Sequence, residues 1–116
     1  MGEKILIIDE DAGNRESLKT ILGDGYELIL TDDTDLGIGI LNKNREIALL
    51  IININSSEEN KLQNIKTTCP NLPICLAINS QSNKKSASTL NSEDRIIKPF
   101  KSPEVLAVIN KHLQRS

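Results

Sequence analysis

Short apolar runs alternate with helix-like segments along the whole chain, and this alternation constrains the fold more than any other feature. The runs are rich in Ile and Leu and predict strands at 4–8, 26–31, 48–54, 74–78 and 95–98. Strands that alternate with helices form a parallel sheet with right-handed crossovers and helices on both faces. The sequence therefore predicts a doubly wound α/β fold, with residues 1–116 as a single domain.

The segments between these runs differ in how strongly they favour helix. The last one, 102–114, is the clearest, because Ser102 is a good N-cap, Pro103 suits the first helical position, and a regular apolar stripe follows. A first helix is expected from Asn14 to the glycine at 23, and others at 34–43 and 58–68. Two glycines weaken the helix at 34–43, at about 1 kcal/mol each. Any helix in the small polar tract 79–92 should be short.

Composition excludes several classes of function. The chain has 116 residues, a net charge of −2 and 14 Lys and Arg spread along its length, so the basic patch of a nucleic-acid-binding protein is absent. Tyr26 and Phe100 are the only aromatic residues, which leaves little for base stacking. No apolar run is long enough to span a bilayer and no leader pattern is present, so we expect no membrane contact and a cytoplasmic location. Cys69 and Cys75 are expected to be reduced thiols.

Polar residues follow the predicted strands at the places where such sheets bind ligands. In an open α/β sheet the site lies beyond the carboxyl ends of the strands, where strand order reverses. The candidate residues are Asp9, Glu10, Asp11, Asn53, Asn55, Asn79, Ser80 and Lys98.

Three motifs carry a family resemblance over nearly the whole chain. They are "KILIIDEDAGNRESLKTIL" near the N-terminus, "GYELILTDD" after it, and "RIIKPF" near the C-terminus. With this order of elements, the chain resembles a response-regulator receiver domain of the CheY-like superfamily. The resemblance implies a flavodoxin-like (βα)5 sheet with strand order 2-1-3-4-5, and a role in bacterial two-component signalling or a phosphorelay.

The resemblance also assigns roles to individual residues. Asp9 and Glu10 match the acidic pair that holds Mg²⁺ in the family, and Lys98 matches the lysine that contacts the phosphoryl oxygens. Asn53 stands where the family has the aspartate that accepts the phosphoryl group from a histidine kinase. A carboxamide is not a nucleophile, and no aspartate occurs between Asp35 and Asp94, so a small shift of the alignment does not restore one.

Other family positions depart from the pattern as well. The residue that should hydrogen-bond the phosphoryl group aligns with Ile78, and the aromatic switch residue aligns with Arg95. Polar residues replace the Met-Pro that usually follows the acceptor. Because these changes occur together, we interpret Asn53 as natural degeneracy rather than as an engineered block.

An amide at position 53 suggests a hypothesis for the site. Carboxylates around an empty metal site repel each other, and Asn53 removes one of them. Its NH2 group could donate to Asp9 while its oxygen accepts from Lys98, which gives a polar network that needs no metal, with Mg²⁺ binding weak or lost. In the simpler interpretation, the acidic residues 9–11 only cap the first helix, and Lys98 with Pro99 only shapes a loop.

The expected function is a degenerate receiver that is not an enzyme and acts as a phosphorylation-independent interaction or dimerisation module. We expect its partner, or a second copy, to bind a basic face within residues 83–114 that carries Lys84, Lys85, Arg95, Lys101 and Lys111; a solvated charge distribution is the alternative. His112 is expected at the surface or half-buried.

One alternative is a working phosphoacceptor that uses Mg²⁺ and another carboxylate such as Asp9 or Glu10, or an aspartate at 53 in the natural gene. A dinucleotide-binding domain lacks its glycine-rich loop.

Overall fold

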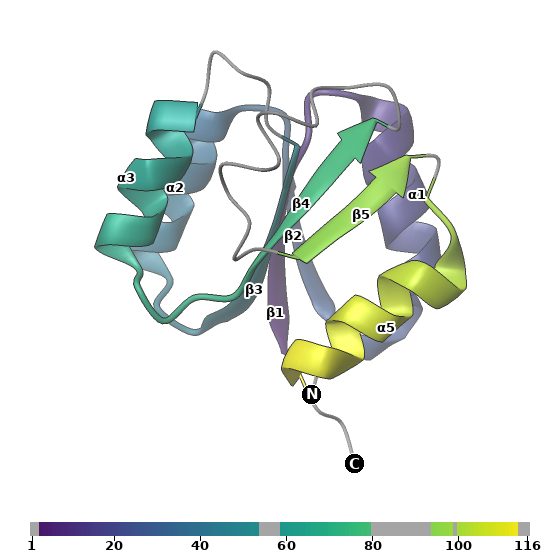
Figure 1. Ribbon diagram of the computed structural model, residues 1–116. Coiled ribbons are helices and arrows are strands. Elements are labelled where there is room, and N and C mark those ends of the chain that lie inside the picture. The colour runs from purple at the N-terminus through teal and green to yellow at the C-terminus, as the bar shows by residue number, and fades with distance from the viewer. Residues whose placement is uncertain (1–2, 54–58, 80–93, 99, 114–116) are drawn as a thin grey trace.

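The computed structural model describes residues 3–53, 59–79, 94–98 and 100–113. They form one five-stranded parallel sheet with strand order β2-β1-β3-β4-β5 (Figure 1). The strands are β1 (Lys4–Ile8), β2 (Glu27–Thr31), β3 (Ile47–Asn53), β4 (Ile74–Asn79) and β5 (Asp94–Lys98). The predicted α/β class and the strand order implied by the resemblance are both confirmed.

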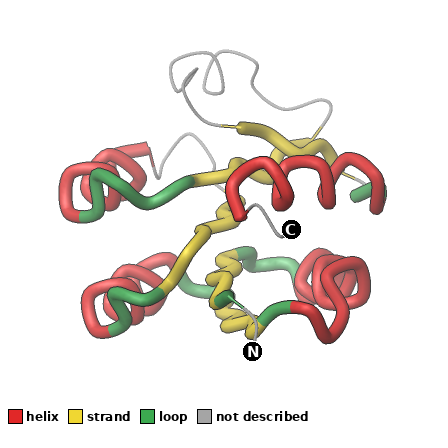
Figure 2. Tube along the Cα trace, turned by 90° about the horizontal axis from the view of Figure 1, so that it is seen from below, coloured by secondary structure: helices red, strands yellow, loops and turns green. Residues whose placement is uncertain are grey.

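Helices cover both faces of this sheet, as Figure 2 shows in the view along its layers. The helices α1 (Ala12–Leu22) and α5 (Ser102–Leu113) lie on one face, and α2 (Thr34–Lys43) and α3 (Glu59–Thr68) on the other. A short 3-10 turn, Gly23–Gly25, follows α1, and Gly23 takes a φ of 61° where the helix ends. Asn55 and residues 80–92 of the small polar tract, Ser80 among them, lie outside the described residues, and so does any short helix in that tract.

Two helix starts differ slightly from the sequence prediction. The first helix begins at Ala12 rather than Asn14, because the Asp11 side chain caps it and accepts a hydrogen bond from the Gly13 amide at 2.7 Å. The last helix begins one residue early, at Ser102, and the Val105 amide donates to the Lys101 carbonyl at 3.0 Å. Ser102 is therefore the first residue of this helix and not its N-cap.

The sheet separates two hydrophobic layers, and the alternation of side chains along each strand decides which layer a residue joins. In β1, Ile5 and Ile7 face α1 and α5, whereas Leu6 and Ile8 face α2 and α3. All four side chains are at most 1% exposed. Because β1 is buried on both faces, the polar residues that directly follow it lie outside the two hydrophobic layers, at the carboxyl edge of the sheet. No helix among the described residues is long and apolar enough to cross a membrane.

Candidate functional site at the carboxyl edge of the sheet

The central strand and two others bring together three residues that are distant in sequence. Asp9 directly follows β1, Asn53 ends β3 and Lys98 ends β5. Asp9 is 1% exposed, which is unusual for a carboxylate and requires that its charge be compensated locally. The structure therefore places the predicted trio in one buried cluster at the edge where ligands bind in this class of fold.

One carboxylate oxygen of Asp9 accepts hydrogen bonds from three donors. The Asp11 backbone amide donates to Asp9 Oδ1 at 2.9 Å, and the side-chain amides of Asn14 and Asn53 donate to the same oxygen at 3.4 Å each. The donation from Asn53 to Asp9 is the contact that the sequence hypothesis expected. The contact from Asn14 was not predicted. It arises because α1 begins at Ala12, which places its first turn beside the end of β1.

The other carboxylate oxygen faces the lysine. Lys98 Nζ lies 3.3 Å from Asp9 Oδ2, and the two side chains are 10% and 1% exposed. The hypothesis that the Asn53 oxygen accepts from Lys98 is wrong in this respect: within the described part of the chain, Lys98 pairs with Asp9 instead. A buried ammonium gains more from a full negative charge than from a neutral carbonyl oxygen, which explains this choice of partner.

A second cation, which the sequence analysis missed, also reaches Asp9. The Arg15 side chain donates from NH1 to the backbone carbonyl of Asp9 at 2.6 Å. A basic residue in the first turn of a helix that directly follows an acidic strand end is the signal that could have identified it. Asp9 thus accepts hydrogen bonds at its backbone carbonyl and at Oδ1, whereas the buried Oδ2 makes no hydrogen bond and has only the ion pair with Lys98.

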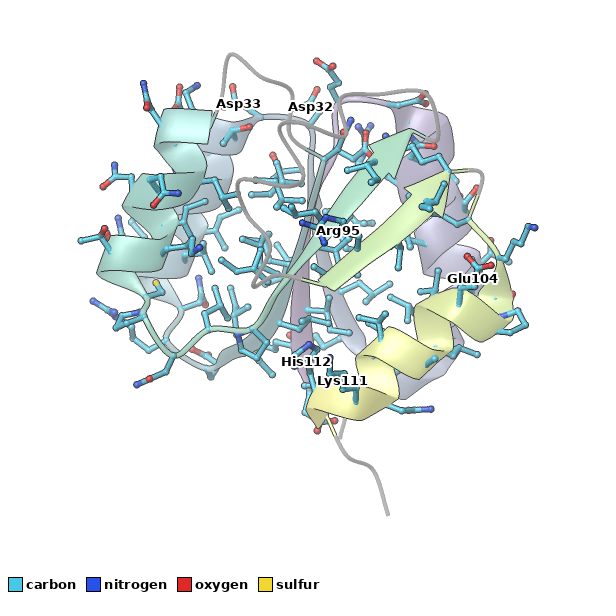
Figure 3. All side chains as sticks on the ribbon, in the orientation of Figure 1. Asp32, Asp33, Arg95, Glu104, Lys111 and His112 are labelled. Carbon is cyan, nitrogen blue, oxygen red and sulfur yellow. The ribbon has the colours of Figure 1, made fainter. Side chains whose placement is uncertain are left out.

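Glu10 does not join this cluster. It is exposed and lines a polar cleft that shares Asn53 with the cluster and is also lined by Ile8, Asp32, Asp33, Thr34, Asp35 and Lys61. Asp33 caps α2, because its Oδ1 accepts from the amides of Asp35 and Leu36. Lys61 bridges the cleft to Asp35 at 3.3 Å. Figure 3 shows Asp32 and Asp33 at this edge, and Lys111 and His112 far from it.

The oxygen atoms of this cluster and of Glu10 are the groups that would have to hold a magnesium ion. Hard divalent cations bind oxygen ligands in a nearly octahedral arrangement. Here Asp9 Oδ1 accepts from three N–H donors, and Asn53 directs its NH2 group, which cannot ligate a metal, to that oxygen. Asp9 Oδ2 is buried without a hydrogen bond and has the Lys98 ammonium 3.3 Å away. Among the described residues no group of three His, Cys, Asp or Glu side chains is arranged to hold a metal.

The remaining positions assigned from the resemblance lie on the outer two strands. Ile78 lies on β4 opposite Ile97 and packs against the layer under α2 and α3. Arg95 lies on β5 with Ile97, on the face opposite Ile96, which packs with α5. Of the basic face, Arg95, Lys101 and Lys111 are described, while Lys84 and Lys85 lie outside the described residues. His112 is half-buried, as predicted.

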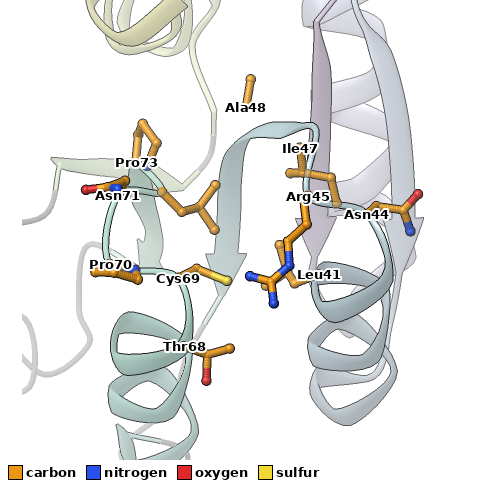
Figure 4. A pocket seen from close by; sticks show the side chains of 11 residues that line it. Leu41, Asn44, Arg45, Ile47, Ala48, Thr68, Cys69, Pro70, Asn71 and Pro73 are labelled. Atoms are coloured by element: carbon orange, nitrogen blue, oxygen red, sulfur yellow. The ribbon is translucent and has the colours of Figure 1, made fainter.

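A separate cavity of about 390 Å³ opens at the other end of the strands (Figure 4). It lies between the end of α2, the start of β3 and the turn from α3 to β4, and its lining includes Arg45 and Cys69. Cys69 and Cys75 are both free thiols. Because this cavity lies at the amino end of β3, it is not part of the Asp9 cluster.

Comparison with solved structures assigns this geometry to the receiver class. A response regulator receiver domain protein from Clostridium thermocellum superposes with a TM-score of 0.83 at 20% identity, covering 99% of this chain and 96% of that one. Chemotaxis protein CheY4 from Vibrio cholerae gives 0.81 at 18% identity, covering 97% and 99%. NtrX from Brucella abortus gives 0.85 at 26% identity, covering 98% of this chain but 26% of NtrX. The fold of this chain is therefore that of a response-regulator receiver domain.

The family within that class follows from a match to the sequence. The model of the family described as flagellar regulatory protein FleQ matches residues 4–114, and the chain belongs to this family. A search among curated proteins gave no match.

Proposed function

We propose that this receiver domain acts without phosphoryl transfer, as a constitutive protein-interaction module of a response regulator in the bacterial cytoplasm, and that it is not an enzyme. One observation carries the proposal: the residue at the end of β3 is Asn53, and its NH2 group donates to Asp9 at 3.4 Å. A carboxamide cannot attack phosphorus, and in this position it adds a hydrogen-bond donor to a carboxylate whose charge is already paired with Lys98.

The state of the other carboxylates supports the same proposal. Asp9 is 1% exposed, its Oδ1 accepts from three donors and its Oδ2 faces the Lys98 ammonium, so an incoming phosphoryl group could not reach it in line without breaking the cluster. Glu10 is exposed but lies in the cleft beside Lys61 and the α2 acids, where several negative charges would repel a phosphodonor. Neither carboxylate replaces the missing aspartate.

We place the partner surface on the basic face within residues 83–114. Its described members are Arg95, Lys101 and Lys111, together with Ile97, whose side chain is 46% exposed. Arg95 and Ile97 lie on the face of β5 that points away from α5, and Lys101 and Lys111 lie at the start and end of α5. Cations together with an exposed apolar residue suit an acidic protein partner that buries a hydrophobic contact.

Intact mass spectrometry after incubation with acetyl phosphate and Mg²⁺ tests the absence of phosphoryl transfer. A receiver known to react under these conditions is the positive control, and Asn53→Asp is the matched variant of this chain. We expect no mass increase for the wild-type protein. One added phosphoryl group on the wild type, mapped to any carboxylate, would refute the proposal.

The partner surface needs a separate experiment. The wild-type domain, Arg95→Glu and the control Lys43→Glu, which lies on α2 away from this face, would each be used to capture proteins from a lysate of the source cell. We expect a protein that the wild type and Lys43→Glu retain equally and that Arg95→Glu loses. Equal retention by all three would contradict the assignment of this face.

A further inference from the structure

The edge strand β2 lacks the features that usually protect a sheet edge. Among the residues that the structure describes it pairs with β1 alone, in a regular register that runs from Lys4 opposite Glu27 to Ile8 opposite Thr31. Its central residues, 28–30, are Leu-Ile-Leu and are all partly exposed. Natural edge strands are commonly protected by Pro, by an inward-pointing charge or by a bulge, and the centre of β2 has none of these.

The direction of the backbone groups on β2 follows from two hydrogen bonds. The Glu27 amide donates to the Glu3 carbonyl, and the Thr31 carbonyl accepts from the Asp9 amide, so the groups of residues 27 and 31 point toward β1. In a parallel ladder the direction alternates from one residue to the next. The amides and carbonyls of Leu28 and Leu30 therefore point away from the sheet, toward any strand that adds to this edge.

A second copy of the same strand matches these groups. If two β2 strands pair in antiparallel fashion about a two-fold axis at Ile29, Leu28 of each copy lies opposite Leu30 of the other. All four outward groups of each strand then take part in ladder hydrogen bonds. Glu27 lies opposite Thr31, so no like charges face each other, and Ile29 packs against its own symmetry mate.

Apolar side chains on both sides of the edge extend this surface. On the α1 side, a groove runs beside β2 and is lined by Glu16, Lys19, Thr20, Gly23, Tyr26, Leu28 and Leu30. On the other side, α2 packs on β1 and β2 and carries Leu36, which is 61% exposed. Asp35 forms an ion pair with Lys61 of α3, so its side of α2 faces α3. Leu36 lies about 100° further around the helix, on the flank of α2 away from α3.

We propose that β2 is a self-association edge, through which two copies of this chain form one continuous sheet by antiparallel β2–β2 pairing centred on Ile29. This surface is separate from the basic face within residues 83–114, and the proposal holds whether or not the domain accepts a phosphoryl group. Five residues a side bury a small area, so we expect a reversible dimer that forms at about 100 µM rather than a permanent one.

Analytical ultracentrifugation of the full chain over a range of concentrations tests the proposal. We expect the mass to rise from 12.8 kDa toward twice this value for the wild type. Ile29→Lys should remain monomeric, because it places two ammonium groups beside the axis, whereas Ile97→Lys on the opposite edge strand should dimerise like the wild type. A monomeric wild type, or a dimer lost in Ile97→Lys and kept in Ile29→Lys, would overturn the proposal.

A cross-linking variant covers the case in which Ile29→Lys fails to fold. In a Cys69→Ser background, Ile29→Cys places two thiols at a non-hydrogen-bonded pair, where the Cα separation of about 4.5 Å permits a disulfide. We expect rapid formation of a covalent dimer on mild oxidation, and much slower formation for the control Ile97→Cys. Equal rates for the two variants would show random collision and would exclude the proposed pairing.

Discussion

The buried carboxylate of Asp9 is the residue on which the site depends, and its ion pair with Lys98 gives the first prediction. Lys98→Met keeps an apolar stem of similar length but leaves a carboxylate that is 1% exposed without its counter-charge. Because an uncompensated buried charge is costly, we expect the free energy of unfolding to fall by about 3 kcal/mol in urea titrations at pH 7.

Lys101→Met is the matched control, since Lys101 is exposed. It should change the free energy of unfolding by less than about 0.5 kcal/mol. If Lys98→Met were as mild as this control, the Asp9 charge would be neutralised by the neighbouring amides alone, and the ion pair would have no structural role.

At the scale of single residues, the sequence predicted which side chains would meet but not how they would pair. Asp9, Asn53 and Lys98 follow three strands of a parallel sheet, so topology alone brings them together. That Lys98 pairs with Asp9 rather than with Asn53 follows from the full charge of the carboxylate, which strand order alone does not bring out. The contact from Arg15 depends on the side-chain conformation of a long residue, which the sequence pattern does not encode.

At the scale of elements, α2 approaches the sheet so closely that it requires glycine at one position. A Cβ on Gly37 would overlap Cδ1 of Ile8 and lie 2.8 Å from its Cγ1, whereas a Cβ on Gly39 would meet nothing within 4 Å. We expect Gly37→Ala to destabilise the fold by about 1–3 kcal/mol through overpacking. Gly39→Ala should stabilise it by about 0.5–1 kcal/mol through helix propensity, in the same urea titrations.

The essential result is that the two substitutions change the free energy of unfolding in opposite directions. If both variants were stabilised, α2 would be able to move away from Ile8 at little cost. From the sequence both glycines are expected to weaken the helix equally, because helix propensity is a local property. The distance between a helix and the sheet beneath it is a tertiary property, and it is what distinguishes Gly37 from Gly39.

An ion pair between the start of β1 and the turn before β3 predicts a pH dependence. The Lys4 ammonium donates to Glu46 at 2.8 Å and lowers the pKa of that carboxyl below its ordinary value of 4.5. A lowered carboxyl pKa contributes stability above the ordinary value, and this contribution is lost as pH falls through the folded pKa. We therefore expect the wild type to exceed Glu46→Gln in stability at pH 7, with the difference disappearing in acid.

Thermal unfolding of both proteins between pH 3 and 7 measures this difference. The pair is exposed, so the difference should also shrink as salt is raised at pH 7. A difference that stays constant down to pH 3 would mean that Glu46→Gln acts through lost packing and not through lost charge.

At the scale of the whole molecule, the alternation of apolar runs and helices was sufficient to predict the fold, and the resemblance supplied the strand order. The exposed edge of β2 was not predicted, because it follows from which strand is outermost and from which way its amides point. Strand periodicity shows which side chains share a face, but it does not show which backbone groups remain without a neighbouring strand.

The stability of the whole domain should not depend on magnesium, and Asn53→Asp should change this. The variant adds a carboxylate beside Asp9, so without metal we expect it to be less stable than the wild type through like-charge repulsion. Free Mg²⁺ at about ten times its Kd would then stabilise the variant by about 1.4 kcal/mol, because it binds only the folded state. The measurement is Tm in EDTA and in Mg²⁺, with K⁺ at equal ionic strength as control. If Mg²⁺ raised the Tm of the wild type as much as that of Asn53→Asp, Asn53 would leave a metal site intact. The hypothesis that the Asp9 cluster needs no metal would then be wrong.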